Sequence, residues 1–284
     1  MNKLSSGKRT QIITALVEGN SIASTCRMTG AAKLTVLSLL AEVGTACSAF
    51  QDRWLRNLDC KRVQVDEIWS FVYSKAKNVP ASFRGTFGYG DVWTFTALCA
   101  DTKLLITWRL APRSQDIAAE FLSDLASRLN GRIQLTTDGH PMYPFAVDLS
   151  FGPDAVDFAV LVKVYNEPVK EERRKYSPSR FIGTTVTKVY GEPDDEHIST
   201  SYVERSNLTW RMSNRRMTRL TNAFSKKLAN HAHHLAINFM HYNFVRVHRT
   251  LRTTPAVAAG VAENPWKMSD LLDLGMWLET EEAA

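Results

Sequence analysis

The run of β-branched and aromatic side chains from Arg62 to Val72 constrains the fold more than any other segment. This composition predicts a β-strand. Asp66 stands inside the run, and because aspartate is depleted in strands, its presence there needs a structural or functional reason. Glu67 follows it directly, and the alternation of side chains along a strand would point it to the opposite face. Composition alone does not choose between these two carboxylates.

The segments that follow alternate between strand and helix patterns. After a glycine-rich loop come two short strand-like segments. A helix then begins near Ser114 with apolar residues on one face, and Asn130-Gly131 ends it. The predicted strands cover residues 93–100, 104–110, 132–138, 156–165 and 184–190, and long helical character is predicted from residue 202 to about 247. Three strands, a helix and a fourth strand are the opening order of an RNase H-like core. We therefore expect an α/β fold with an RNase H-like mixed sheet flanked by helices.

The N-terminal segment, residues 1–56, has an all-helical pattern. Helices are predicted over residues 11–17, 22–28 and 31–53, with a turn at Thr29-Gly30. This arrangement is compatible with a helix-turn-helix, and also with a plain three-helix bundle. We expect a helix-turn-helix DNA-binding domain over residues 1–56 and a catalytic domain over residues 60–250. A charged insertion around residues 166–196 and an acidic tail over residues 251–284 complete the predicted organisation.

The chain of 284 residues carries no motif of a secreted or membrane protein. No apolar run approaches the length of a membrane span, and the N-terminus lacks the pattern of a secretory signal. The four cysteines form no CxxC pair, so we expect buried thiols rather than a zinc site. These features predict a cytoplasmic, nucleoid-associated protein without a membrane partner.

Positive charge is concentrated in one segment. Between residues 201 and 252 there are ten lysines or arginines, and Glu204 is the one acidic residue. From residue 253 to the end the balance reverses, with one lysine and six acidic residues. A basic segment of this kind is typical of a polyphosphate partner, and a solvated helix face is the alternative.

Two further carboxylates lie at positions suited to chemistry. Asp138 ends the predicted strand 132–138 and precedes Gly139. An Asp-Gly pair is common in simple turns, but the ends of core strands also hold ligands in open α/β sheets. Glu204 fits a capping box with Ser201, which would give it a purely structural role. Its position on a helical face with Arg211 and Arg215 also suits a metal ligand beside bound phosphates.

Three segments carry a resemblance to a known family. They are Val65-Asp66-Glu67-Ile68-Trp69-Ser70-Phe71-Val72, Thr136-Thr137-Asp138-Gly139-His140-Pro141-Met142-Tyr143 and Tyr202-Val203-Glu204-Arg205-Ser206-Asn207-Leu208-Thr209 with the arginines after it. The chain resembles transposases of the insertion-sequence-one family, which carry an Asp-Asp-Glu triad on an RNase H-like fold. The resemblance covers about residues 25–257 loosely and these three segments closely.

The resemblance implies a set of site residues. It favours Asp66 over Glu67 and makes Asp66, Asp138 and Glu204 the catalytic and metal-binding triad. Cleaving a phosphodiester needs charge stabilisation on two oxygens, which two Mg²⁺ ions supply, and Mg²⁺ prefers oxygen ligands. The cofactor expected is therefore a pair of Mg²⁺ ions, for which Mn²⁺ can substitute. The expected DNA-binding residues are Arg205, Asn207, Arg211, Arg215, Arg216, Arg219, Lys226 and Lys227.

The function expected is cleavage and joining of the ends of a mobile element. The partners implied are double-stranded DNA, as element ends and as target, and further copies of the chain in a homodimer or higher oligomer. Two alternatives stay open: a non-catalytic DNA-binding regulator derived from a transposase, and a structure-selective nuclease on the same fold. Fold alone does not separate them.

Three other features have simpler interpretations. Trp210 is expected in the core rather than stacked on a base. His197 is expected to be a polar loop residue. The pair His231 and His234 is spaced for metal binding, but no third ligand is evident, so we expect no zinc there.

Overall fold

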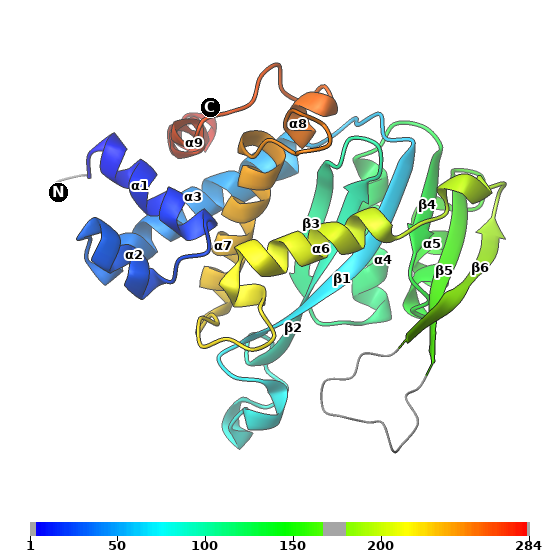
Figure 1. Ribbon diagram of the computed structural model, residues 1–284, viewed down its shortest axis with the longest axis horizontal. Coiled ribbons are helices and arrows are strands. Elements are labelled where there is room, and N and C mark those ends of the chain that lie inside the picture. The colour runs from blue at the N-terminus through cyan, green and yellow to red at the C-terminus, as the bar shows by residue number, and fades with distance from the viewer. Residues whose placement is uncertain (1–3, 167–179, 283–284) are drawn as a thin grey trace.

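The computed structural model describes residues 4–166 and 180–282. The chain folds into helices on both sides of one sheet (Figure 1). The helices are α1 (Ser6–Val17), α2 (Ile22–Thr29), α3 (Lys33–Trp54), α4 (Gln115–Ser127), α5 (Met142–Phe151), α6 (Ser201–Ser213), α7 (Leu228–Met240), α8 (Pro255–Ala258) and α9 (Met268–Glu282). The strands are β1 (Arg62–Val72), β2 (Gly90–Cys99), β3 (Leu105–Ala111), β4 (Ile133–Thr137), β5 (Val156–Asn166) and β6 (Arg180–Tyr190).

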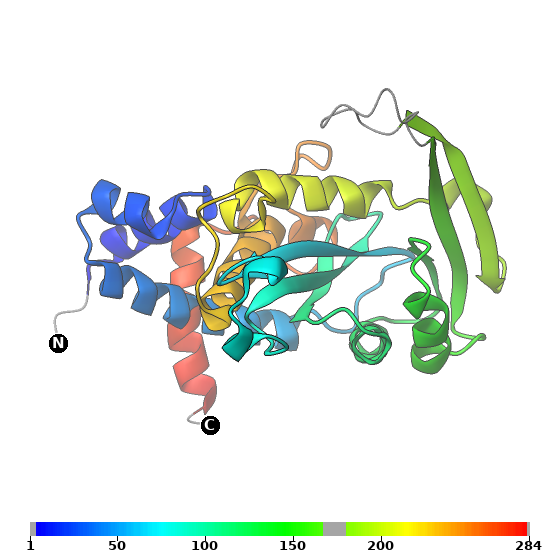
Figure 2. The same ribbon diagram turned by 90° about the horizontal axis from the view of Figure 1, so that it is seen from below.

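The sheet is mixed, with the strand order β3-β2-β1-β4-β5-β6. The first three strands form an antiparallel meander, β4 pairs parallel to β1, β5 pairs parallel to β4, and β6 returns antiparallel. The expected α/β class, with a mixed sheet flanked by helices, is confirmed. The long β5–β6 hairpin forms one end of the molecule (Figure 2).

The alternation of side chains along β1 separates two cores. Val63 and Val65 face α4 and α5, where they join the largest cluster of buried apolar side chains. Ile68 faces the other side and packs with Trp210 of α6 and Phe239 of α7. The sheet is therefore covered by α4 and α5 on one face and by α6 and α7 on the other (Figure 1).

The N-terminal helices are packed tightly against the rest of the molecule. α3 contacts α7 and α9, and Gly44 of α3 makes this approach possible. A Cβ atom at Gly44 would lie 2.5 Å from the Cβ of His233, far inside van der Waals contact. α3 is also long and apolar enough to cross a membrane, but half of that stretch is buried inside the protein, as in a core helix. Whether α1–α3 act as a helix-turn-helix stays a prediction.

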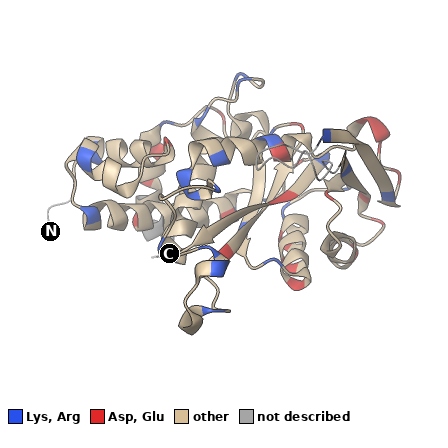
Figure 3. Cartoon of the chain, turned by 60° about the horizontal axis from the view of Figure 1, so that its bottom comes forward, with Lys and Arg blue, Asp and Glu red and all other residues tan. Residues whose placement is uncertain are grey.

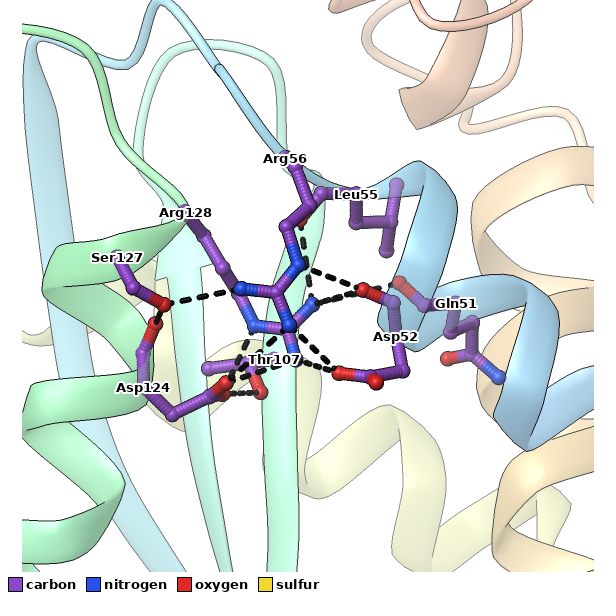
Figure 4. Close-up of polar contacts among 8 residues, drawn as sticks. All are labelled: Gln51, Asp52, Leu55, Arg56, Thr107, Asp124, Ser127 and Arg128. Carbon is purple, nitrogen blue, oxygen red and sulfur yellow. Dashed lines mark hydrogen bonds and ion pairs between the residues drawn. The ribbon is translucent and has the colours of Figure 1, made fainter.

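Arg128 links the end of α3 to α4 by hydrogen bonds and ion pairs (Figure 4). Its guanidinium donates to the main-chain oxygens of Asp52 at 3.1 Å and Leu55 at 3.2 Å. It also pairs with the carboxylates of Asp52 and Asp124. The Arg128 side chain is 6% exposed. A buried arginine with this many partners fixes two elements rigidly because every donor has an acceptor.

The predicted helical character of residues 202–247 is interrupted. α6 ends at Ser213, and a short 3-10 turn (Arg215–Met217) and a loop precede α7. Asn214 causes the break: its backbone is extended and its side chain accepts from the amide of Arg216. α5, for which no element was expected, begins directly after Pro141. Part of the expected charged insertion, residues 167–179, lies outside the described residues.

Candidate active site

Asp66 lies in the middle of β1, on the face covered by α6. Its Oδ2 accepts a 2.7 Å hydrogen bond from the side-chain amide of Asn207 in α6. Its Oδ1 accepts a 2.8 Å bond from the backbone N–H of Glu67. These two donors orient the carboxylate. Each oxygen accepts one bond and so keeps a lone pair free.

Asp138 follows β4 and lies beside Asp66 because of the strand register. β4 is parallel to β1, with Thr137 opposite Val65, so the next residues of both strands are neighbours. Its Oδ1 accepts from the backbone N–H of His140 at 3.0 Å. Gly139 is required by close packing: a Cβ there would lie 2.5 Å from Cγ2 of Val162 on β5. The Asp-Gly pair therefore forms a turn, and its glycine also allows close packing against β5.

Glu67 is nearer to this pair than alternation along the strand suggested. Ligand oxygens of Asp66, Glu67 and Asp138 lie within 4.8 Å of one another, and these three form the one cluster of potential metal ligands among the described residues. Glu67 has strong partners of its own. The hydroxyl of Tyr143 in α5 donates to one oxygen, and Arg113 pairs with the other at 2.8 Å. The sequence signal for Glu67 was its adjacency to Asp66.

Glu204 occupies the first turn of α6, and β1 fixes the start of that helix. Oε1 of Gln64 accepts from the backbone N–H groups of Tyr202 at 2.9 Å and Val203 at 3.0 Å. The side chain of Gln64 thus replaces the usual helix cap. Because Gln64 and Asp66 lie on the same face of β1, this contact places the first turn of α6 beside Asp66.

Glu204 does not form the alternative capping box with Ser201. α6 begins at Ser201, so Ser201 is inside the helix and Thr200 is the residue before it. The Glu204 carboxylate instead accepts from the Thr200 hydroxyl at 2.7 Å and pairs with the ammonium of Lys163 from β5. The charge of Glu204 acts on Asp66, but its oxygens lie outside the group of three.

Burial and crowded negative charge together shape the electrostatics of the site. Burial, followed by the charge of Glu67, raises the pKa of Asp66 to about 7, and the charges of Asp138 and Glu204 act in the same direction. Burial also raises the pKa of Glu67, against the lowering effects of Tyr143 and Arg113. A divalent cation would relieve this repulsion, and carboxylate oxygens are the ligands that Mg²⁺ prefers.

The predicted DNA-binding residues fall into two groups. Exposed side chains without a carboxylate partner among the described residues are Arg205, Arg215, Arg219, Lys226 and Lys227. The other three are engaged within the protein. Asn207 bonds to Asp66, Arg211 donates to the main-chain oxygen of Met217 at 2.8 Å, and Arg216 is buried against Ser225 at 2.8 Å. Figure 3 shows acidic positions on the sheet and basic positions on the helices and loops beside it.

The remaining candidates have structural roles. Trp210 is 2% exposed and packs against Phe239 and Tyr242, as expected for a core residue. His231 is buried between the hydroxyls of Ser70 and Ser225, each 3.1 Å away. His234 is held by Asn238 at 2.9 Å. His197 ends a short 3-10 helix (Asp195–His197) and is 43% exposed beside Asp194.

Comparison with known proteins identifies no family for the chain. No protein-family model matches the chain, and no curated protein matches it in sequence. Solved structures do match in shape. One is a piggyBac transposase in a synaptic complex with hairpin DNA, which is 10% identical, with a TM-score of 0.44, over 96% of this chain and 70% of that chain. The class that fold and site define is thus a mixed α/β protein with a cluster of carboxylates at its central strands.

Proposed function

We propose that the chain is a DNA transposase of the Asp-Asp-Glu type on an RNase H-like core. The observation that carries the proposal is the cluster of carboxylate oxygens from Asp66, Glu67 and Asp138, with the charge of Glu204 acting on Asp66. Asp66 comes from the central strand, Asp138 from the end of the neighbouring parallel strand, and Glu204 from the helix that crosses them. Crowding of this kind costs stability, so it is expected where the carboxylates share a cation.

The cofactor proposed is a pair of Mg²⁺ ions, with Mn²⁺ as a substitute. Asp66 and Asp138 would hold them, and Glu204 would complete the second site. Bound there, the ions supply charge stabilisation at the attacking and leaving oxygens of a phosphodiester. The raised pKa of Asp66 supports the fit, because a carboxylate crowded by like charges binds a cation favourably.

The chain's own side chains prepare this site. Asn207 donates to one oxygen of Asp66, and the backbone N–H of Glu67 donates to the other. Tyr143 and Arg113 contact the two oxygens of Glu67, whereas Asp66 and Asp138 have no cationic partner in the part of the chain that the structure describes. Lys163 neutralises Glu204 in the structure, and Glu204 must exchange this partner before it contributes to cation binding.

The reaction proposed has two steps in the same site. Water attacks the phosphodiester at the end of the element and frees a 3′-hydroxyl, which then attacks target DNA. Arg215, Arg219, Lys226 and Lys227 would contact the backbone of double-stranded DNA, which fixes its register without reading sequence. The helix-turn-helix of residues 1–56 would recognise the ends, and joining two ends requires at least a dimer. Membership of the insertion-sequence-one family and a cytoplasmic, nucleoid-associated location belong to the same proposal.

The test is cleavage and joining of DNA that flanks the gene. The wild-type chain with Mg²⁺ should cut at a defined end and should join a pre-cut end to a plasmid. Cutting without joining would favour a structure-selective nuclease, and binding without cutting in Mg²⁺ or Mn²⁺ would favour a non-catalytic regulator. Either of these two results would overturn the assignment as a transposase.

A further inference from the structure

A second cationic site lies on the other side of α6, away from the carboxylates. It is a cavity of about 390 Å³ between α6 and the segment that follows a short π-helix (His241–Val245). Five basic side chains line it, and no aspartate or glutamate among the described residues does: Lys103, Arg205, Arg246, His248 and Arg249. A hollow with positive charge and no internal counter-charge favours an anionic ligand.

The geometry of α6 separates this cavity from the candidate active site. Glu204, Asn207 and Arg211 lie along one side of the helix. Arg205 and Thr209 line the cavity. At about 100° per residue these two sets point in nearly opposite directions. The cavity is therefore a separate feature and not an extension of the carboxylate cluster.

The cationic groups repel one another in the absence of a ligand. The pKa of His248 is lowered by burial and, after that, by the charges of Lys103 and Arg246. The pKa of His241 is also lowered, by burial and by Arg246. The nearest acid that acts on Lys103 is Asp101, which is already paired with Arg62. An anion in the cavity would relieve this repulsion.

His248, which lines the cavity, has an unpartnered ring nitrogen. Its Nδ1 is buried and has no hydrogen-bond partner among the described residues, although buried polar groups nearly always have one. The loop that carries it is held in place. The N–H of His248 donates to the oxygen of Thr253 at 2.8 Å, and the N–H of Arg252 donates back to His248 at 2.9 Å. The cavity is thus formed before a ligand arrives.

The floor of the cavity is equally fixed. The Tyr242 hydroxyl donates to the main-chain oxygen of Lys103 at 2.9 Å, and Asn243 exchanges two bonds with the backbone of Leu105. The ammonium of Lys103 lies 3.3 Å from the ring centre of Tyr202. These contacts hold cations from three separate elements at one place, which reduces the entropy lost on binding.

The cavity continues into a second hollow along α6. The two share Arg205, Thr209, Tyr242 and Arg246, and the second hollow runs on to Ser213 and to Glu18, which follows α1. Two connected hollows along one helix suit a polymer better than a single small ion.

From these observations we infer that the cavity binds a backbone phosphate of DNA, on the side of α6 opposite the carboxylates. The inference extends the proposed function, since it adds a second DNA contact to the one beside the triad. The shared chemistry is a phosphate group, which inorganic phosphate or a free nucleotide would also supply, and the experiment separates these sources.

The test measures binding of a fluorescein-labelled 20-base-pair duplex to the full chain in EDTA, over a range of salt. Replacing Arg246 and Arg249 together with alanine should weaken binding about tenfold at 100 mM salt. It should also reduce the slope of log K against log salt by about 2, because two phosphate contacts are lost. The matched control replaces Arg109 and Lys267 with alanine, which removes the same charge elsewhere and should leave the slope nearly unchanged.

Two further arms make the result decisive. Arg246→Lys keeps the charge and should retain the wild-type slope, which separates a phosphate contact from a folding defect. Addition of ADP or inorganic phosphate should displace the duplex only at millimolar concentrations. An unchanged slope in the double variant, or displacement by micromolar ADP, would overturn the inference. DNA binding in EDTA does not require the carboxylates, so this outcome is independent of the cleavage assay.

Discussion

The side-chain amide of Asn207 donates a 2.7 Å hydrogen bond to the carboxylate of Asp66, which joins the middle of α6 to the central strand of the sheet. Asn207 is itself buried, and Gln64 anchors the start of the same helix to the same strand. α6 is therefore fixed to β1 by polar contacts at two places. This relationship sets the position of Glu204 with respect to Asp66.

Replacing Asn207 with alanine should lower DNA cleavage by about 10- to 100-fold, as is usual when a residue that orients a metal ligand is lost. Without the side-chain amide of Asn207, the carboxylate of Asp66 is no longer held in its orientation, although the acid itself remains. Cleavage rates at saturating Mg²⁺ provide the measurement. Leu208→Ala on the exposed side of α6 is the control. Equal rates for the two variants would show that Asn207 does not position Asp66.

The pH dependence of stability should reveal the crowded carboxylates. The pKa of Asp66 is raised from 3.8 to about 7 in the folded protein, so between these values the folded chain binds more protons than the unfolded chain. The contribution of Asp66 to the unfolding free energy of the metal-free protein should therefore fall as pH rises from about 4 to about 7. The Asp66→Asn variant should lack this decline in unfolding free energy, which is on the order of 1–3 kcal/mol.

Denaturant titrations of both proteins at several pH values provide this comparison. Histidines and Glu67 titrate in both chains, so the difference between the two curves isolates Asp66. Parallel curves would mean that Asp66 ionises normally and that its surroundings are not crowded by negative charge.

Lys163 should compete with a cation for Glu204, because its ammonium pairs with that carboxylate. Lys163→Met should therefore raise the affinity for Mn²⁺ by about tenfold, or ~1.4 kcal/mol. Calorimetric titration with Mn²⁺ measures this directly. Lys188→Met is the matched control, because Lys188 pairs with Asp195 in a comparable surface contact. Weaker Mn²⁺ binding in the Lys163 variant than in the control would contradict the competition.

Arg128 should be far more important to stability than its neighbour Arg56. Arg128→Ala leaves Asp124 without its main partner and several buried carbonyls without a donor, at a cost of about 3–5 kcal/mol. Arg56 is 36% exposed and pairs with Asp52 on the surface, so Arg56→Ala should cost less than about 1 kcal/mol. Similar losses in both variants, measured by urea unfolding, would show that the contact between α3 and α4 is not fixed by Arg128.

The strands of the sheet could be predicted from the sequence because their signal is local. The bounds of β1 agree with the composition of the run Arg62–Val72. α5 was missed because Pro141 and Pro144 favour a loop, whereas burial of Tyr143 and Val147 against α4 favours the helix. The break after Ser213 was missed because helix propensity extends across it, and the contacts of Asn214 and Arg216 that stop the helix are tertiary.

For the candidate site, the sequence indicated which acids matter but not their partners. The register of β1 and β4 brings Asp66 and Asp138 together, and strand patterns make that pairing foreseeable. The place of Glu67 was not foreseeable, because its proximity depends on Tyr143 and Arg113 from other elements. The pairing of Lys163 with Glu204 likewise depends on how far β5 extends beyond its pairing with β4.

Binding of Mn²⁺ to the wild-type chain and to single carboxylate variants tests the central claim most directly. Calorimetry at pH 8 should show two ions bound by the wild type, strong loss of binding in Asp66→Asn and Asp138→Asn, and loss of one ion in Glu204→Gln. Mn²⁺ binding that is unchanged in all three variants would contradict the proposal that these side chains share a pair of divalent ions.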